Sequence, residues 1–226
     1  MHIVRDYQFA NEADIGAAVA IGNFDGVHLG HQAVLNVVRQ KAIELGCPMG
    51  VMTFEPHPRE YFAPDAPAFR LMSAEAKTHR LAKLGVTHLY QLNFNAALSS
   101  LSAREFCQDV IHESLKLKHV VVGADFCFGK GRMGTAETLR NMGAELGFGV
   151  TILPLVSDEK GAFSSTAIRT ALSAGQSEVA AHMLGHWHRI DARVEHGDAR
   201  GRDLGYPTAN LSLSGLHLPK FGVYAV

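Results

Sequence analysis

"VAIGNFDGVHLGHQAVL" (residues 19–35) begins as an apolar run, turns through three glycines and ends with the periodicity of a helix. The apolar run at 17–21 predicts a buried strand. Along the helix that follows, apolar side chains share one face: Val34, Leu35, Val38, Ala42 and Leu45. A strand, a tight turn and a helix in this order predict a βα unit, the repeat of folds with a parallel sheet.

The same alternation continues through the first 185 residues. Further apolar runs predict strands at 49–54, 87–92, 119–123 and 149–153. Helical periodicity predicts helices at 74–84, 103–115 and 135–146, the second opened by a capping box of Ser102 and Glu105. The proline-rich run at 55–67 predicts a loop, because Pro56 and Pro58 disfavour helix. We therefore expect an α/β domain over residues 1–185, with a mostly parallel sheet and helices on both faces.

The pattern changes after residue 185. "HWHRIDARVEHG" (186–197) alternates as an antiparallel strand does, and residues 201–226 are rich in turns with no helical period. We expect a second, all-β unit over residues 186–226. About forty residues cannot bury a core of their own, so this unit either packs against the first domain or is incomplete.

Composition limits the class of protein and its partners. The chain has 226 residues, and its 21 Lys and Arg nearly balance its 22 Asp and Glu. No overall field attracts nucleic acid or a membrane surface, so neither is an expected partner. Cys47, Cys107 and Cys127 lack metal-binding spacing, which predicts reduced thiols. With neither a signal-peptide pattern nor a long apolar run, the sequence predicts a cytoplasmic protein, and it leaves the oligomeric state open.

The turn after the first strand has the features of a phosphate site. Gly22, Gly26 and Gly30 allow a sharp turn and close approach of a ligand, and the helix start directs free N–H groups at the same place. The carboxyl ends of strands are where open parallel sheets bind ligands. The spacing matches neither the P-loop nor the GxGxxG fingerprint, which disfavours a P-loop hydrolase and an ordinary dehydrogenase.

Two histidines stand in this turn. His28 and His31 are three residues apart at a helix start, so both rings can donate hydrogen bonds to phosphate oxygens. The alternative is an ordinary capping or solvated pair. For Asp25, a role in shaping the turn is favoured over a role as a magnesium ligand.

Four ordered motifs resemble those of a known family, and the resemblance spans essentially the whole chain. The motifs are "GNFDGVHLGH" (22–31), "TFEPHPRE" (53–60), "VVGADFCFGKGRMG" (121–134) and "FSSTAIRTAL" (163–172). The first resembles the HxGH signature of nucleotidylyltransferases, in the form typical of the bacterial bifunctional riboflavin kinase/FAD synthetases. The resemblance implies a Rossmann-like nucleotidylyltransferase domain over residues 1–185.

The resemblance also implies a reaction, the transfer of AMP from ATP to FMN. Pyrophosphate leaves, FAD is the product, and Mg²⁺ bridges the ATP phosphates. By this resemblance His28, His31 and Arg169 are the catalytic residues, which stabilise charge in the transition state. The implied ATP-binding residues are Gly22, Asn23, Phe24, Asp25, Gly26, His28, His31, Ser164, Ser165, Thr166 and Arg169.

For several residues that the resemblance assigns to the phosphate and flavin sites, an ordinary structural role is the alternative. Ser164 to Thr166 are also ordinary N-cap residues, and Ala167 stands where many relatives carry a second basic residue. The implied flavin-binding residues are Phe54, Pro56, His57, Pro58, Asp125, Phe126 and Phe128. The alternative for the first group is a merely kinked loop, whereas exposed aromatics in the second would suit an isoalloxazine ring. The basic loop at 129–132 is either solvated or able to close on phosphates.

The last segment carries a second resemblance. "HGDARGRDLGYPTANL" (196–211) resembles the riboflavin kinase signature, in which Thr208 and Asn210 would hold Mg²⁺ and nucleotide. For "GYPTAN" alone, the alternative is a hairpin turn. A complete kinase barrel is longer than this segment, so we expect an incomplete barrel without kinase activity in this chain, and riboflavin phosphorylation by a longer parent protein.

Two other functions remain open from the sequence. One is an HxGH nucleotidylyltransferase with a different acceptor. The other is a regulatory protein that binds flavin or nucleotide without turnover.

Overall fold

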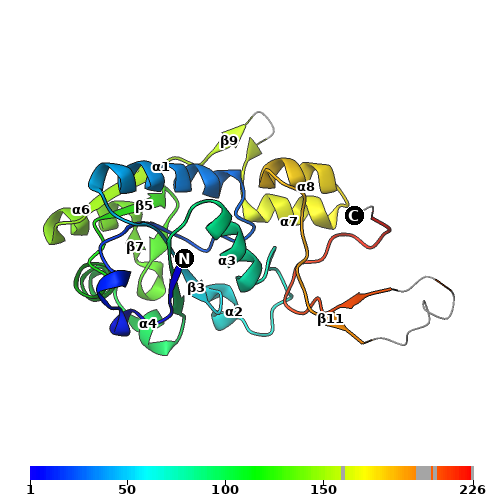
Figure 1. Ribbon diagram of the computed structural model, residues 1–226, viewed down its shortest axis with the longest axis horizontal. Coiled ribbons are helices and arrows are strands. Elements are labelled where there is room, and N and C mark those ends of the chain that lie inside the picture. Colours follow the sequence, from blue (N-terminus) through cyan, green and yellow to red (C-terminus); the bar gives the residue numbers. More distant parts are fainter. Residues whose placement is uncertain (159–160, 197–204, 206–207, 225–226) are drawn as a thin grey trace.

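A six-stranded sheet forms the centre of the protein (Figure 1). The structure is a computed structural model that describes residues 1–158, 161–196, 205 and 208–224. The strand order is β1-β4-β3-β2-β5-β8, and each neighbouring pair is parallel. The strands are β1 (His2–Val4), β2 (Ala18–Ile21), β3 (Met49–Glu55), β4 (His88–Asn93), β5 (His119–Gly123) and β8 (Gly149–Leu153).

Helices lie between these strands and after β8. They are α1 (Leu29–Leu45), α2 (Pro58–Phe62), α3 (Ala74–Lys83), α4 (Ala96–Ser100), α5 (Ala103–Glu105), the π-helical η3 (Phe106–Ser114), α6 (Ala136–Leu146), α7 (Ser165–Ser173) and α8 (Ser177–Leu184). Short 3₁₀ turns occur at η1 (Tyr7–Phe9), η2 (Glu12–Asp14) and η4 (Lys130–Arg132). Two-stranded pairs are β6 (Cys127–Phe128) with β7 (Gly134–Thr135), β9 (Ser157–Asp158) with β10 (Gly161–Ala162), and β11 (Val194–Glu195) with β12 (Asn210–Leu211). In the described part of the chain, no helix is long and apolar enough to cross a membrane.

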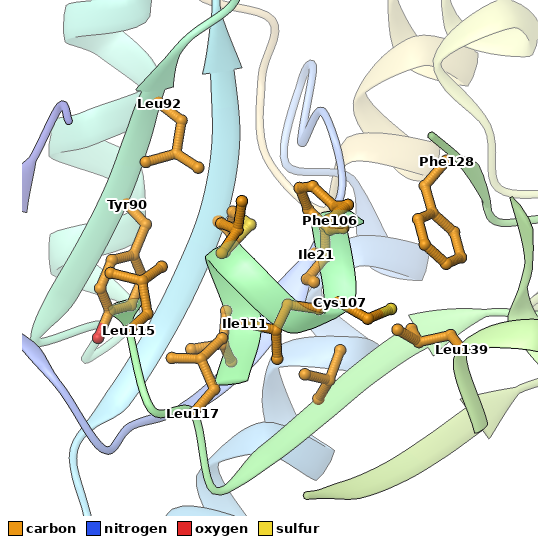
Figure 2. Close-up of a cluster of buried hydrophobic side chains, with 14 of the residues drawn as sticks. Ile21, Tyr90, Leu92, Phe106, Cys107, Ile111, Leu115, Leu117, Phe128 and Leu139 are labelled. Atoms are coloured by element: carbon orange, nitrogen blue, oxygen red, sulfur yellow. The ribbon is translucent and has the colours of Figure 1, made fainter. Parts of the chain in front are cut away.

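The core has two layers because successive strand residues face opposite sides of the sheet. On β2, Val19 and Ile21 pack with side chains of η3 and α6, and Figure 2 shows this layer around Ile111 and Leu139. Ala18 and Ala20 face the other side, toward α1 and α3. The helix face predicted after the first strand is buried through Ala42, whereas Leu45 is 42% exposed.

Three predictions from the sequence are wrong in detail. The proline-rich loop contains α2, because Pro58 occupies the first helical position, where the missing N–H costs nothing. The helix predicted at 103–115 changes after Glu105 into π-helical η3. Of the strand predicted at 186–197, the described residues form only Val194–Glu195.

The strand order places the first turn at a switch point. The central strand β2 lies between β3 and β5, so the chain builds the sheet outward in one direction and then in the other. Ligands of doubly wound sheets bind beyond the carboxyl ends of the strands where this reversal occurs. The turn at 22–28 leaves β2 at that position.

The C-terminal segment lies against the first domain. Leu216 pairs with Arg70 in a parallel bridge, and the His217 amide donates to the Arg70 carbonyl at 2.7 Å. The amide of Lys220 donates to the Leu172 carbonyl of α7 at 2.9 Å. The sequence predicts that the β unit either packs against residues 1–185 or is incomplete. Packing of the segment at 216–220 against residues 1–185 is observed.

Candidate functional site

The turn between β2 and α1 has an unusual backbone. Phe24 and Val27 have positive φ angles of 52° and 43°, although both side chains are buried. Such angles are costly for non-glycine residues and persist only when neighbours enforce them. The carbonyl of Asn23 accepts hydrogen bonds from Thr53 Oγ1 at 3.2 Å and from Lys77 Nζ at 3.3 Å. The turn is thus fixed from β3 and α3.

The two histidines stack at the start of α1. The ring centroids of His28 and His31 lie 3.7 Å apart, and Phe24 packs against His31 at 4.8 Å. His28 caps the helix, since its Nδ1 accepts a long hydrogen bond of 3.4 Å from the His31 amide. The capping alternative is therefore true of His28. In the described part of the chain, the Nε2 atom of that ring has no hydrogen-bond partner.

Both rings are neutral near pH 7. Burial, aided by the charge of Arg169, lowers the pKa of His28 to about 4. Burial and the neighbouring His28 lower the pKa of His31 well below its usual range. Because Nδ1 of His28 accepts a hydrogen bond, the proton of the neutral ring resides on Nε2. Among the described residues, Nδ1 of His31 is buried with no hydrogen-bond partner, which marks it as an atom that a ligand would satisfy.

Asp25 joins this turn to α7. Its Oδ2 accepts from Arg169 Nη1 and its Oδ1 from the Leu71 amide, both at 2.8 Å. Its carbonyl accepts from the Ser165 hydroxyl at 2.8 Å. Burial raises the pKa of Asp25, although the Leu71 amide and the Arg169 charge oppose the rise. Both carboxylate oxygens are engaged, so Asp25 has the predicted role of shaping the turn.

The start of α7 closes the other side of the site. Ser164 caps this helix by accepting from the Ala167 amide at 3.1 Å, and Thr166 is exposed in its first turn. A Cβ atom at Gly30 would lie 3.1 Å from the His28 ring and 3.2 Å from the Phe163 carbonyl. Glycine at position 30 thus permits the close approach of α1 and the segment before α7. The predicted ATP residues from both motifs are brought together.

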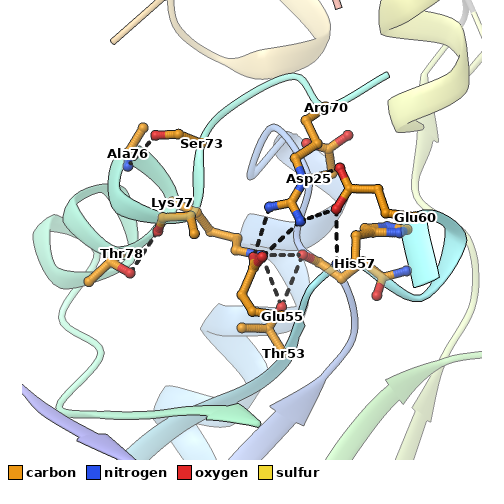
Figure 3. A network of polar contacts seen from close by, with 12 residues as sticks. Asp25, Thr53, Glu55, His57, Glu60, Arg70, Ser73, Ala76, Lys77 and Thr78 are labelled. Atoms are coloured by element: carbon orange, nitrogen blue, oxygen red, sulfur yellow. Dashed lines mark hydrogen bonds and ion pairs between the residues drawn. The ribbon is translucent and has the colours of Figure 1, made fainter. Parts of the chain in front are cut away.

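A polar network that the sequence did not predict lies under the turn (Figure 3). Lys77 is 4% exposed and contacts Thr53 Oγ1 at 3.1 Å and Glu55 Oε1 at 3.2 Å. Arg70 forms ion pairs with Glu55 and Glu60. Burial lowers the pKa of Lys77. One signal was present in the sequence, since Lys77 precedes the apolar Leu81 by one helical turn on the buried face of α3.

The flavin candidates at the end of β3 lie next to this network. His57 caps α2 by accepting from the Arg59 amide at 3.0 Å, and burial lowers its pKa to about 4. Phe54 packs against Phe94 at 5.9 Å. Tyr61 and Phe62, which the sequence analysis missed, contact the same Phe94 ring at 5.3 and 5.7 Å. Phe62 is 68% exposed, so this aromatic cluster offers an exposed ring at the end of α2.

The second group of flavin candidates follows β5, the neighbour of β2. Asp125 is exposed two residues after β5 ends. Phe126 stacks on Phe128 at 5.5 Å, but Phe128 is buried against Phe106 in the core. Only Phe126 keeps a partly exposed ring. In the basic loop, the Lys130 amide donates to the Leu101 carbonyl at 2.7 Å, which places its start beside α5.

The kinase candidates lie apart from this site. Thr208 and Asn210 are exposed, and Asn210 begins β12 opposite Glu195 of β11. Pro207 and most of the preceding signature lie outside the described residues. Where the structure describes the chain, no three His, Cys, Asp or Glu side chains gather as a metal site would require.

A doubly wound sheet with stacked histidines and a capped helix at its switch point defines an α/β domain of the nucleotidylyltransferase class. The family model for FAD synthetase matches residues 10–167, and the model for riboflavin kinase matches residues 184–226. The chain belongs to the FAD synthetase family.

Relatives and one solved structure are similar to this chain over nearly its whole length. The bifunctional riboflavin kinase/FMN adenylyltransferase of Pseudomonas fluorescens is 41% identical over 227 residues, which cover 100% of this chain and 72% of that protein. The protein of the same description from Escherichia coli K12 is 40% identical with the same coverage. A crystal structure described as a macrolide-efflux protein of Streptococcus pneumoniae is 35% identical with a TM-score of 0.83, covering 98% of this chain and 72% of that chain. Its description names efflux, whereas both family models and these curated relatives name flavin enzymes.

Proposed function

We propose that this chain transfers AMP from ATP to FMN, forming FAD and releasing pyrophosphate. The observation that carries the proposal is the pair of stacked, neutral histidines at the switch point, with Arg169 held beside them. Membership in the FAD synthetase family supports the choice of acceptor. Curated relatives are named FMN adenylyltransferases.

The side chains present suit phosphoryl-type transfer, which needs alignment and charge stabilisation and no covalent nucleophile. His28 Nε2–H and, in the tautomer that carries its proton there, His31 Nδ1–H would donate to phosphate oxygens as the charge on them grows. In the described part of the chain, Nη1 makes the hydrogen bonds of the Arg169 side chain, so its other nitrogens are free for the leaving pyrophosphate. Because Asp25 is fully engaged, Mg²⁺ would enter on ATP as part of the substrate.

The flavin would lie beyond the end of β3. Phe54, Pro56, His57 and Pro58 would line its site with the exposed ring of Phe62. Asp125, Phe126 and Phe128 would contribute from the adjacent edge of the sheet, Phe128 by supporting Phe126 from behind.

We further propose two units, residues 1–185 and residues 186–226, the second belonging to a riboflavin kinase. In that unit, Thr208 and Asn210 would take part in binding Mg²⁺ and nucleotide.

The direct test is incubation with FMN, ATP and Mg²⁺ while FAD and pyrophosphate are measured. We expect both products in equal amounts. Product from another acceptor without FAD would favour a different nucleotidylyltransferase. Tight flavin binding without turnover would favour the regulatory protein.

A further inference from the structure

Three arginines gather between α2 and α7, and they differ in how their charges are compensated. Arg70 forms ion pairs with two carboxylates, and Arg169 forms one with Asp25. Arg59 is exposed and forms no ion pair with a carboxylate among the residues that the structure describes. Its positive charge is therefore uncompensated.

Arg59 and Arg169 face the same aromatic ring. The guanidinium carbons lie 4.6 and 5.6 Å from the centroid of Phe69. Phe69 is 6% exposed and its carbonyl accepts from Arg169 Nη1 at 3.3 Å, so the ring is a fixed support. An arginine stacked on a ring keeps its N–H edge free to donate.

The two like charges influence each other. Burial lowers the pKa of Arg169, and the nearby charge of Arg59 lowers it further. Asp25 pairs with Arg169 and not with Arg59, so the two guanidinium groups leave a net positive charge beside the histidine turn. An anion with several charged oxygens offsets such repulsion and matches the fork geometry of arginine. Ala167, in the first turn of α7, adds no cation of its own.

We propose that Arg59 binds a phosphate group of the bound substrates, as a second guanidinium beside Arg169. The inference rests on the proposed function and adds a substrate-binding residue to it. Phosphate is the chemistry recognised, and it has two sources, the polyphosphate of ATP and the phosphate of FMN.

The test compares Arg59→Gln with Arg140→Gln, which removes the same charge from the exposed face of α6. Steady-state kinetics give KM for ATP and for FMN, and calorimetry gives the affinity of the free enzyme for inorganic pyrophosphate. We expect R59Q to raise one KM about tenfold, the loss typical of one charge-assisted contact, and R140Q to change neither. A raised KM for ATP with weaker pyrophosphate binding assigns ATP as the source. A raised KM for FMN alone assigns FMN.

Two further variants separate charge from packing. If Arg59 only covers Phe69, then Arg59→Met, which keeps the apolar stem, should have both KM values of the wild type, whereas Arg59→Lys should not. This result overturns the inference. A phosphate role predicts partial recovery with Lys and none with Met. Unchanged KM values in R59Q, with FAD still formed by the wild type, also overturn it and leave the proposed function standing. Should the wild type form no FAD, calorimetry is carried out with pyrophosphate and with FMN, and equal affinities of wild type and R59Q for both ligands overturn the inference independently.

Discussion

Asp25 and Arg169 are 144 positions apart in the chain, yet Oδ2 of one lies 2.8 Å from Nη1 of the other. Asp25 is 7% exposed and stands in the turn that carries the histidines, while Arg169 stands in the second turn of α7. This ion pair fixes the two halves of the proposed phosphate site relative to each other.

Loss of Arg169 should reduce the free energy of unfolding more than loss of the Asp25 charge. Arg169→Gln leaves a buried carboxylate unpaired, which costs about 3 kcal/mol in the free energy of unfolding. Asp25→Asn should cost less, because Asn keeps an acceptor for the Leu71 amide. Urea denaturation of both variants and the double mutant checks the pair. A double-mutant loss equal to the sum of the single losses would show that the two residues are not coupled.

The histidines should be needed for the rate and not for the fold. His28→Ala or His31→Ala should each lower the rate of FAD formation by ~10² or more, as expected for a preorganised donor to developing charge. His79→Ala, on the exposed side of α3, is the control and should keep its rate. Single-turnover assays with saturating ATP make the measurement. Rates within about twofold of wild type in well-folded variants would rule out the role in the transition state.

Gly30→Ala should act through His28. The added Cβ would lie 3.1 Å from the His28 ring, so the ring must shift by a few tenths of an ångström. Alanine favours helix by up to about 1 kcal/mol over glycine, so stability should hardly fall while the rate falls about tenfold. The control is the same substitution in the His28→Ala background, where it should have no further effect. A similar loss in both backgrounds would assign the effect to the contact with the Phe163 carbonyl.

Lys77→Met should loosen the phosphate turn from beneath. The substitution removes the hydrogen bonds of Nζ to Asn23, Thr53 and Glu55 but keeps an apolar stem of similar length. We expect a loss of about 2 kcal/mol in the free energy of unfolding, because hydrogen bonds to a buried charge are lost. We also expect a raised KM for ATP. Lys83→Met, at the exposed end of the same helix, should change neither quantity. An unchanged KM would confine Lys77 to stability.

Acid should destabilise the fold through the buried histidines. The pKa of His28 is about 4 in the folded protein and 6.5 ordinarily, so the unfolded chain takes up the proton first. Its contribution to stability is complete above about pH 6.5 and is lost as the pH falls to about 4. His28→Gln should reduce the slope of unfolding free energy against pH by at most about 1.4 kcal/mol per unit. Urea denaturation across this window, with His79→Gln as control, gives the slope. An unchanged slope would contradict the neutral ring.

Most of the sheet could be predicted because β2, β3, β4, β5 and β8 are local apolar runs separated by amphipathic helices. Strand β1 was missed because it is only three residues long and two of these residues are exposed. Helix α2 was missed because its prolines suggest a loop unless the helix start is recognised at Pro58 itself.

The residues of the candidate site were harder to predict from local sequence patterns. The spacing of His28 and His31 predicts a phosphate turn, but nothing near Asp25 indicates Arg169 as its partner. Lys77 and Arg59 carry no motif, and their roles depend on neighbours brought close by folding. From the sequence, only the resemblance to the ordered motifs of the family placed the histidine turn and the start of α7 in one site.

The contacts of Leu216 and His217 with Arg70 link the segment that matches riboflavin kinase to the segment that matches FAD synthetase. Arg70 serves the first domain through its side chain and the last segment through its carbonyl, while His217 Nε2 lies 3.1 Å from the carbonyl of Arg169. The segment that matches riboflavin kinase thus contacts the backbone at both Arg70 and Arg169. A chimera that exchanged residues after 185 for those of a relative would therefore alter the adenylylation site at a distance from the junction. The two matched segments are in this sense interdependent parts of one scaffold.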